Sequence, residues 1–161
     1  MKKKIISTLM GITVVMAGSA TALAGWNDPQ FIASKATYDA IVKTPDNYNY
    51  LAPATPSYNC LAWALQNQSS WVWPWVSNPT SAEVDNYLYG KGYVGATFPS
   101  EAQIISYGTS STNITHFGRV ADSNYVNAKW GQLERLQSLS WDPYSYSGGY
   151  GPKIKTYAVG H

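Results

Sequence analysis

The hydrophobic pattern changes its period partway along the chain, and this change limits the folds that the chain can adopt. Before Gly90 and Gly92, apolar residues recur at helical spacing, as Val84, Tyr87 and Leu88 do. After these glycines, apolar and polar residues alternate in short runs that turn-forming residues separate. Helices followed by antiparallel strands predict an α+β fold, with N-terminal helices packed on one face of a small antiparallel sheet. We expect strands at residues 102–107, 115–121, 125–130 and 154–159.

Two helix starts can be recognised from their capping residues. Asp28-Pro29 has the form of an N-cap followed by proline at the first helical position, and predicts a helix over residues 29–43. Thr80 and Glu83 have the spacing of a capping box, which predicts a helix that begins there and ends at the following glycines. Residues 130–139 are ambiguous, because their leucines fit helical spacing but the segment is short.

The N-terminus has the pattern of a secretory signal peptide. Residues 1–4 form a basic n-region, residues 5–18 form an apolar run, and Ala22-Leu23-Ala24 is a small-x-small cleavage pattern. The apolar run is shorter than the roughly 20 residues that a spanning helix needs. We therefore expect a signal peptide over residues 1–24, one domain over residues 25–161, and a secreted protein, extracellular or periplasmic, without a membrane anchor.

Charge and composition narrow the classes of partner. Without Lys2, Lys3 and Lys4, the 11 basic residues fall to 8, against 9 acidic ones. The secreted chain is then near neutral, so we expect no nucleic-acid partner. The 7 tryptophans and 13 tyrosines suit a groove for sugars or extended peptides, and equally a tyrosine-rich core. We expect a monomer.

Cys60 is the single cysteine of the chain. It cannot form an internal disulfide, so it is either a reactive thiol or a buried structural residue. Pro53 and Pro56 disfavour helix just before it, and an apolar segment follows. We therefore expect a helix that begins near Cys60 and ends between residues 66 and 70. The positive end of such a helix lowers a thiol pKa.

His116 is the one histidine that precedes the C-terminal residue. Strand alternation places His116, Gly118 and Val120 on one face, which is expected to point inward. It is either a core histidine or the partner of Cys60. A thiol at a helix N-terminus beside an imidazole on a strand is the arrangement of papain-like cysteine hydrolases, because the pair supplies a nucleophile and a base near neutral pH.

Aromatic residues flank the cysteine segment. The proline within Trp71-Val72-Trp73-Pro74-Trp75 argues against a regular helix, and we expect this segment to form a wall beside the Cys60 helix. Trp71, Trp73 and Trp75 would then serve either core packing or substrate stacking, as would Trp63. One cysteine, one internal histidine and scattered carboxylates have no metal-ligand spacing, so we expect neither a metal nor a cofactor.

Several of these segments together resemble a family of small uncharacterised bacterial proteins that is distantly similar to the NlpC/P60 and papain-like cysteine peptidases. The resemblance spans residues 58–159, and its most specific block is Asn-Cys-x-Ala-Trp-Ala. The blocks that carry it are Tyr58-Asn59-Cys60-Leu61-Ala62-Trp63-Ala64, Trp73-Pro74, Ile104 to Gly108, Thr115-His116-Phe117-Gly118-Arg119, Ala128-Lys129-Trp130-Gly131 and Tyr150-Gly151.

The resemblance implies a role for each matching residue. Cys60 would be the nucleophile, His116 the general base, and Asn59 would help to shape the oxyanion site. The chain departs from the family where the third residue is expected, because Ala128 stands in place of a serine and Gln137 falls near a later histidine. Asn127 and Gln137 are the candidates for orienting the imidazole, and a backbone carbonyl or water is the alternative.

The sequence therefore predicts a secreted, papain-like, NlpC/P60-like cysteine hydrolase, a peptidase or amidase that acts on cell-wall or other extracellular peptides. Two alternatives stay open. One is a catalytically inactive extracellular domain that binds glycan, peptide or a partner through its Trp/Tyr surface. The other is an acyl or glutaminyl transferase that uses the same Cys–His pair.

Overall fold

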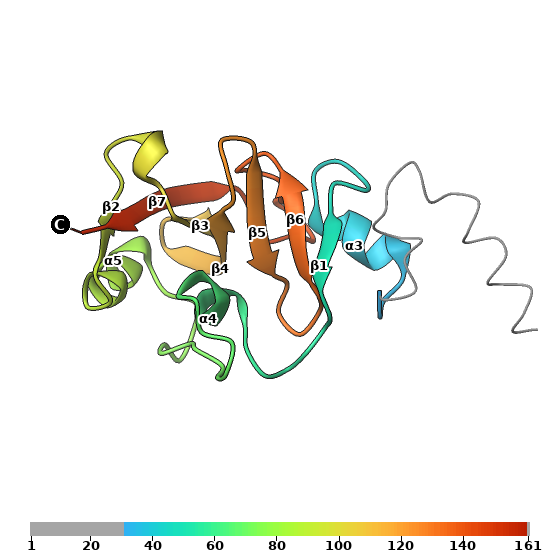
Figure 1. The fold of residues 1–161 in the computed structure, drawn as a ribbon, viewed down its shortest axis with the longest axis horizontal. Helices are drawn as coiled ribbons and strands as arrows, with labels where there is room; N and C mark the ends of the chain where they lie inside the picture. Colours follow the sequence, from blue (N-terminus) through green and yellow to red (C-terminus); the bar gives the residue numbers. More distant parts are fainter. Residues whose placement is uncertain (1–30, 161) are drawn as a thin grey trace, which may run out of the picture.

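The computed structural model of the protein describes residues 31–160. In this part of the chain, seven strands form one antiparallel sheet in the order β1-β6-β5-β4-β3-β7-β2 (Figure 1). A few short helices accompany the sheet, and the predicted antiparallel sheet is confirmed. The strands are β1 (Asn49–Ala52), β2 (Tyr93–Gly95), β3 (Ile104–Ser110), β4 (Asn113–Val120), β5 (Tyr125–Lys129), β6 (Arg135–Leu139) and β7 (Lys153–Val159). The helices are α3 (Lys35–Ile41), α4 (Cys60–Ala64), α5 (Ser81–Tyr89) and the 3-10 turn η1 (Pro99–Glu101).

Helices pack on both faces of the sheet. Ile104 of β3 belongs to a hydrophobic cluster with Leu61 of α4 and Leu88 of α5. Its neighbour Ile105 belongs to a second cluster, which contains Tyr38 of α3. Successive residues of a strand point to opposite faces, so α3 lies on the face opposite to α4 and α5. The prediction that the helices pack on one face is therefore wrong, and adjacent apolar residues in β3 are the sign of a strand buried on both sides.

The central hairpin β3–β4 contains an irregularity that matters for the site. Tyr107 pairs with His116, but the next pair is Gly108 with Ile114. Thr115 is thus an extra residue in β4, which is the arrangement of a β-bulge. The bulge changes the face to which each following side chain of β4 points, and bulges of this kind often redirect a side chain next to a functional site.

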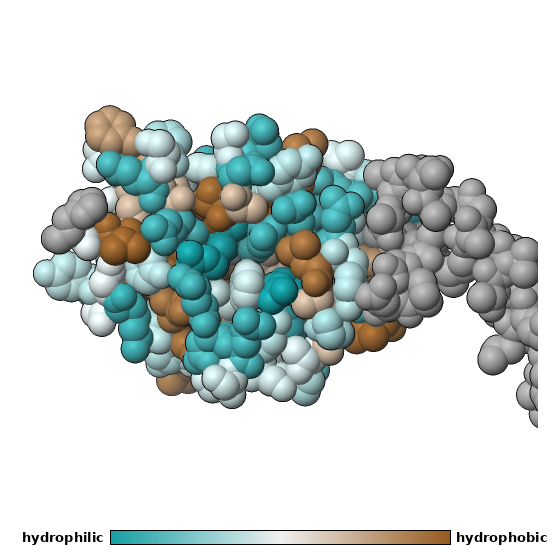
Figure 2. Space-filling model, in the orientation of Figure 1, coloured by the Kyte–Doolittle hydropathy of each residue, from teal (hydrophilic) through white to brown (hydrophobic). Residues whose placement is uncertain are grey.

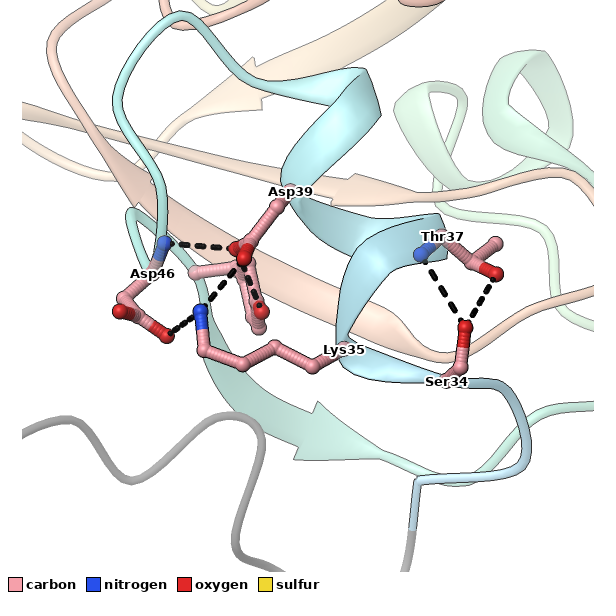
Figure 3. Close-up of polar contacts among 6 residues, drawn as sticks. Ser34, Lys35, Thr37, Asp39 and Asp46 are labelled. Atoms are coloured by element: carbon pink, nitrogen blue, oxygen red, sulfur yellow. Dashed lines mark hydrogen bonds and ion pairs between the residues drawn. The ribbon is translucent and has the colours of Figure 1, made fainter.

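Polar side chains cap the start of helix α3 and tie the helix to the loop that follows it (Figure 3). Ser34 is the N-cap, and its side chain accepts a hydrogen bond from the Thr37 N–H. Lys35 forms ion pairs with Asp39, one turn on, and with Asp46 in the loop that follows. These contacts fix the loop that leads from α3 into β1.

The capping box predicted from Thr80 and Glu83 is confirmed, and it begins helix α5. Thr80 is the N-cap of α5, its hydroxyl accepts from the Glu83 N–H at 3.2 Å, and the Glu83 carboxylate accepts from the Thr80 N–H at 2.7 Å. The helix ends at Gly90, as the sequence predicted.

Two other segments differ from their sequence-based predictions. The helix expected over residues 29–43 is shorter, Lys35–Ile41, and its predicted start at Asp28-Pro29 lies outside the described residues. The ambiguous segment 130–139 contains strand β6, which pairs with both β5 and β1. Its side chains alternate, with Leu136 buried and Leu139 exposed, so the leucines of this segment do not share a helical face.

Hydrophilic and hydrophobic residues are interspersed over the face that Figure 2 shows, and the hydrophobic patches on this face are separate from one another. No helix within residues 31–160 combines the length and the apolar character needed to cross a bilayer. The predicted signal peptide, residues 1–24, lies outside the described part of the chain.

Candidate functional site

Cys60 is the first residue of α4, as the sequence predicted. The helix is short, because it ends at Ala64, before the expected range of residues 66–70. Its apolar side chains, among them Leu61, pack on the face of the sheet that carries Phe117 of β4. This packing places the N-terminal end of α4 against β4, so that Cys60 lies beside the strand that carries His116.

Asn59 is the N-cap of α4, and its amide also holds the aromatic segment beside the helix. The Oδ1 atom accepts from the N–H groups of Ala62 at 3.1 Å and Val72 at 3.2 Å. The Nδ2 atom donates to the Val72 carbonyl at 2.8 Å. Both lone pairs of the amide oxygen are thus used, and all three hydrogen bonds go to main-chain groups of α4 and of the aromatic segment. The structure shows Asn59 in a capping role, and its part in shaping the oxyanion site stays a prediction.

The first half of β4 does not pair with the neighbouring strand β5. In the described chain these strands pair at two positions, Arg119 with Asn127 and Val120 with Val126. Residues 115–117 of β4 therefore have no partner strand on that side. The N-terminal end of α4 lies against this unpaired half of β4, because the thiol of Cys60 interacts with the Phe117 N–H.

A pocket of about 280 Å³ forms at this point. Cys60 reaches it from α4 and His116 from β4, so the structure brings together the two residues that the sequence paired. Of the predicted substrate-binding residues, Asn59, Trp71 and Trp73 also line it. Lining residues that sequence reasoning did not assign to the site are Thr115, Gly131 and Tyr150.

Two other predicted tryptophans lie elsewhere. Trp75 packs against Tyr87 of α5, with ring centroids 5.3 Å apart, and belongs to the core on that face. Trp63 lies under the Arg135 guanidinium, 4.1 Å from its carbon to the ring centroid. Neither of these two tryptophans lines the pocket, so their role is packing. Trp71 and Trp73 form part of the pocket wall.

The residues expected to orient His116 do not reach it. Gln137 and Asn127 pair across β5 and β6, and the Gln137 Nε2 donates to the Asn127 Oδ1 at 3.1 Å. Neither lines the pocket. Asn127 pairs with Arg119, and the guanidinium of Arg119 donates a hydrogen bond to the Ala64 carbonyl of α4. Asn127 therefore points to the α4 face, whereas His116, three residues before Arg119, points to the other.

His116 is held by aromatic rings. Its imidazole lies parallel to the Tyr150 ring, with the centroids 3.7 Å apart and 7° between the planes. The Tyr144 ring meets it edge-on at 5.1 Å. Tyr150 is held in turn, because the Thr115 hydroxyl donates to its carbonyl at 2.6 Å. The signal for Tyr150 was present in the sequence as the Tyr150-Gly151 block, but a block of two common residues does not show which ring it lies against.

Burial determines the charge state of both groups. It raises the pKa of the Cys60 thiol to about 11, although the Phe117, Leu61 and Cys60 N–H groups and the Lys129 charge oppose that rise. Burial also lowers the pKa of His116 to about 3. The expected lowering of the thiol pKa by the helix end is therefore wrong for this structure, because desolvation outweighs it. At neutral pH both groups are uncharged.

Lys129 is a second functional candidate that sequence reasoning missed. It is fully buried, and its ammonium donates to the carbonyls of Thr55 at 2.9 Å, Gly131 at 2.6 Å and Leu133 at 2.5 Å. An ammonium has three donors, so all are used. Burial lowers its pKa to about 8, against the charges of Glu134 and Cys60. Lys129 thus connects the segment that leads into α4, at Thr55, with Gly131, which lines the pocket.

Among the described residues, no cluster of three or more His, Cys, Asp or Glu side chains could hold a metal ion.

Comparison with known proteins relates the chain to one family. No curated protein and no solved structure matches the chain. Residues 49–158 match a family described as a domain of unknown function, DUF7689. This match includes both Cys60 and His116 and covers more than half of the chain. The protein therefore belongs to the DUF7689 family.

Proposed function

We propose that the protein is a cysteine hydrolase of the papain-like, NlpC/P60-like type, with Cys60 as nucleophile and His116 as general base. The observation that carries this proposal is that both side chains line one pocket, although one comes from a helix and the other from a strand. The position of Cys60 at the start of a helix that packs on the histidine-bearing strand supports the papain-like assignment.

The reaction needs only this pair, an amide and water. The Cys60 sulfur attacks the amide carbonyl carbon, and the thiol proton passes to His116. When the tetrahedral adduct collapses, the C–N bond breaks and the imidazolium gives its proton to the leaving amine. A thioester remains on Cys60. Water then attacks it, with His116 as base, and releases the carboxylic acid and the thiol.

The neutral resting state shapes this mechanism. With pKa values of about 11 for Cys60 and about 3 for His116, no ion pair exists at neutral pH before the substrate arrives. The proton must move as the S–C bond forms. General-base assistance of this kind contributes typically 10²- to 10⁴-fold to a rate.

The pocket favours uncharged substrates. Its lining residues carry no charged side chain, and Trp71, Trp73 and Tyr150 supply aromatic surface. The buried Lys129 next to it has all three donors engaged. We infer an amide with an uncharged, apolar or aromatic acyl group, as in a cell-wall or other extracellular peptide. The extracellular setting is proposed from residues 1–24.

The test is acylation by p-nitrophenyl acetate, followed by release of p-nitrophenolate and by intact mass. We expect one acetyl group per chain, on Cys60, and none in Cys60→Ala. His116→Gln should acylate at least 10²-fold more slowly. The proposal fails if the native chain acylates no faster than the chain unfolded in urea. Adding an amine acceptor then separates transfer from hydrolysis, because a transferase forms the new amide.

A second candidate is a binding domain without catalysis. The uncharged state of Cys60 and His116 favours it, together with the 48% exposure of Trp71, which lines the pocket. In that case tryptophan fluorescence should report saturable binding of neutral peptides or glycans that is unchanged in Cys60→Ala, while no acylation of the native chain is seen.

A further inference from the structure

Three neighbouring rings, that of His116 among them, carry buried polar atoms that lack a hydrogen-bond partner within the described chain. The Nε2 atom of His116, the hydroxyl of Tyr144 and the Nε1 atom of Trp130 are each buried and have no hydrogen-bond partner among the described residues. The three rings are neighbours, with centroids 5.1 Å apart for His116 and Tyr144, and 5.8 Å for Tyr144 and Trp130. Buried polar groups are nearly always paired, so three adjacent exceptions indicate a shared network.

The chemistry of the three groups leaves two directions for the bond between Tyr144 and His116, and the proposed role of His116 selects one of them. The indole Nε1–H of Trp130 can only donate, whereas a phenol oxygen accepts through two lone pairs. The Trp130 N–H points toward the Tyr144 hydroxyl and opposes the rise that burial causes in the pKa of that hydroxyl, but the two atoms do not reach hydrogen-bonding geometry. The Tyr144 hydroxyl can then either accept from an Nε2–H of His116 or donate to an Nε2 lone pair. Only the first arrangement leaves Nδ1 unprotonated, as a general base requires.

We propose that the Tyr144 hydroxyl is the positioning group of His116, accepting a hydrogen bond from its Nε2–H while the Trp130 N–H occupies the other lone pair. The Nδ1 atom then carries the free lone pair. His116 lines the pocket, and Nδ1 is not buried without a partner as Nε2 is. Tyr144 therefore makes Nδ1 the basic nitrogen on the pocket side, which Asn127 and Gln137 cannot do. This inference rests on the proposed role of His116 as general base.

Tyr144 is placed for this role by main chain. Its residue forms a bridge with Val42, just after α3, and the next residue, Ser145, donates its N–H to Ile41 and its hydroxyl to Val42. The Tyr144 ring is further enclosed by the rings of Tyr107 at 4.7 Å and Tyr150 at 5.1 Å. Helix α3, on the face opposite to Cys60, thus acts through Tyr144 on the imidazole.

The direct test is the tautomer of His116, read from the ¹⁵N chemical shifts of the histidine rings in the full chain. The sequence holds two histidines, so His161→Ala assigns the signals. We expect the Nε2–H tautomer in the native chain. Tyr144→Phe should lower the ratio of Nε2–H to Nδ1–H about tenfold, which is what one buried hydrogen bond contributes. The Nδ1–H tautomer in the native chain would overturn the inference without any variant.

Tyr107→Phe is the matched control. Tyr107 also packs on His116, at 5.9 Å, but its hydroxyl donates to the Trp141 carbonyl. It should leave the tautomer ratio unchanged, and an equal change in both variants would contradict a role specific to Tyr144.

Acylation of Cys60 separates this inference from the proposed function. Tyr144→Phe should slow acylation by p-nitrophenyl acetate about tenfold through kcat, with KM unchanged, and Tyr107→Phe should not. If the native chain does not acylate at all, the proposed function fails, while the tautomer still tests Tyr144. If Cys60 acylates but Tyr144→Phe changes neither tautomer nor kcat, the inference fails alone.

Discussion

The imidazole of His116 lies flat on the ring of Tyr150, with 3.7 Å between the centroids and 7° between the planes. This contact places the imidazole next to the Cys60 pocket, which Tyr150 also lines. The stack holds the ring from one face, while the Tyr144 ring, which meets it edge-on, limits its rotation. Aromatic packing therefore fixes the plane of the imidazole, whereas the proposed hydrogen bond to Tyr144 selects its tautomer.

Loss of the Tyr150 ring should therefore disturb the site. Tyr150→Leu removes the stack, and aromatic pairs of this kind contribute about 0.5–1.5 kcal/mol beyond their area. We expect Cys60 acylation to slow by about tenfold, since 1.4 kcal/mol corresponds to a factor of ten. Tyr150→Phe keeps the ring and should acylate like the native chain. Equal rates for the leucine and phenylalanine variants would show that the stack has no effect on the base.

The depressed pKa of His116 predicts how stability depends on pH. The pKa is about 3 in the folded chain, against 6.5 for an unperturbed histidine. Between these values the unfolded chain binds a proton that the folded chain does not, so stability falls as pH drops below about 6.5, by at most about 1.4 kcal/mol per pH unit. The free energy of urea unfolding, measured from about pH 7 to pH 5, should show this loss. His116→Gln is the control, and a parallel decline in that variant would assign the loss to other groups.

The role of Lys129 predicts a large destabilisation when its charge is removed. Lys129→Met leaves three partly buried carbonyls without the donor that they share, and each such group costs about 1 kcal/mol, at the lower end of the range for buried groups. We expect a loss of at least about 3 kcal/mol in the free energy of unfolding, measured in urea. Lys153→Met, at an exposed position of β7, is the matched control and should change stability by less than about 0.5 kcal/mol. Similar losses in both variants would contradict the account of Lys129.

Gly151 next to the stacked tyrosine should resist substitution. Its φ is +81°, and an added Cβ would lie 2.4 Å from the Gly108 carbonyl oxygen. Gly92 has a similar φ of +85° but open space around it. Gly92→Ala measures the cost of backbone conformation alone, on the order of 1–2 kcal/mol. Gly151→Ala should cost a further 1–3 kcal/mol or so from the clash. Equal urea midpoints for the two variants would refute the close packing at Gly151.

The local parts of the fold could be predicted from the sequence because their causes are local. Thr80 and Glu83 cap α5, and a helix begins at Cys60, both as predicted. Strands β3, β4 and β5 could be predicted from the alternation of apolar and polar residues, and His116 lies on the strand that was expected to carry it. Strand β6 was ambiguous because its leucine spacing fits two periods, and pairing with β5 and β1 decided it.

Long-range contacts decided the rest. Adjacent Ile104 and Ile105 give no indication of which helix covers which face, so the position of α3 could not be derived. The rings around His116 come from Tyr144 and Tyr150, far along the chain, and no spacing rule connects them. The thiol pKa was predicted from the helix end alone, but burial of Cys60 reverses its direction.

The most direct test of the central claim, that His116 takes the proton of Cys60 in a neutral pair, is the pH dependence of Cys60 acylation in the native chain and in His116→Gln. Between the pKa of His116, about 3, and that of Cys60, about 11, neither group changes its charge. We therefore predict a native rate that is level from about pH 5 to pH 9. The His116→Gln rate should rise about tenfold per pH unit, because only thiolate then reacts. Equal slopes for the two proteins would contradict the claim.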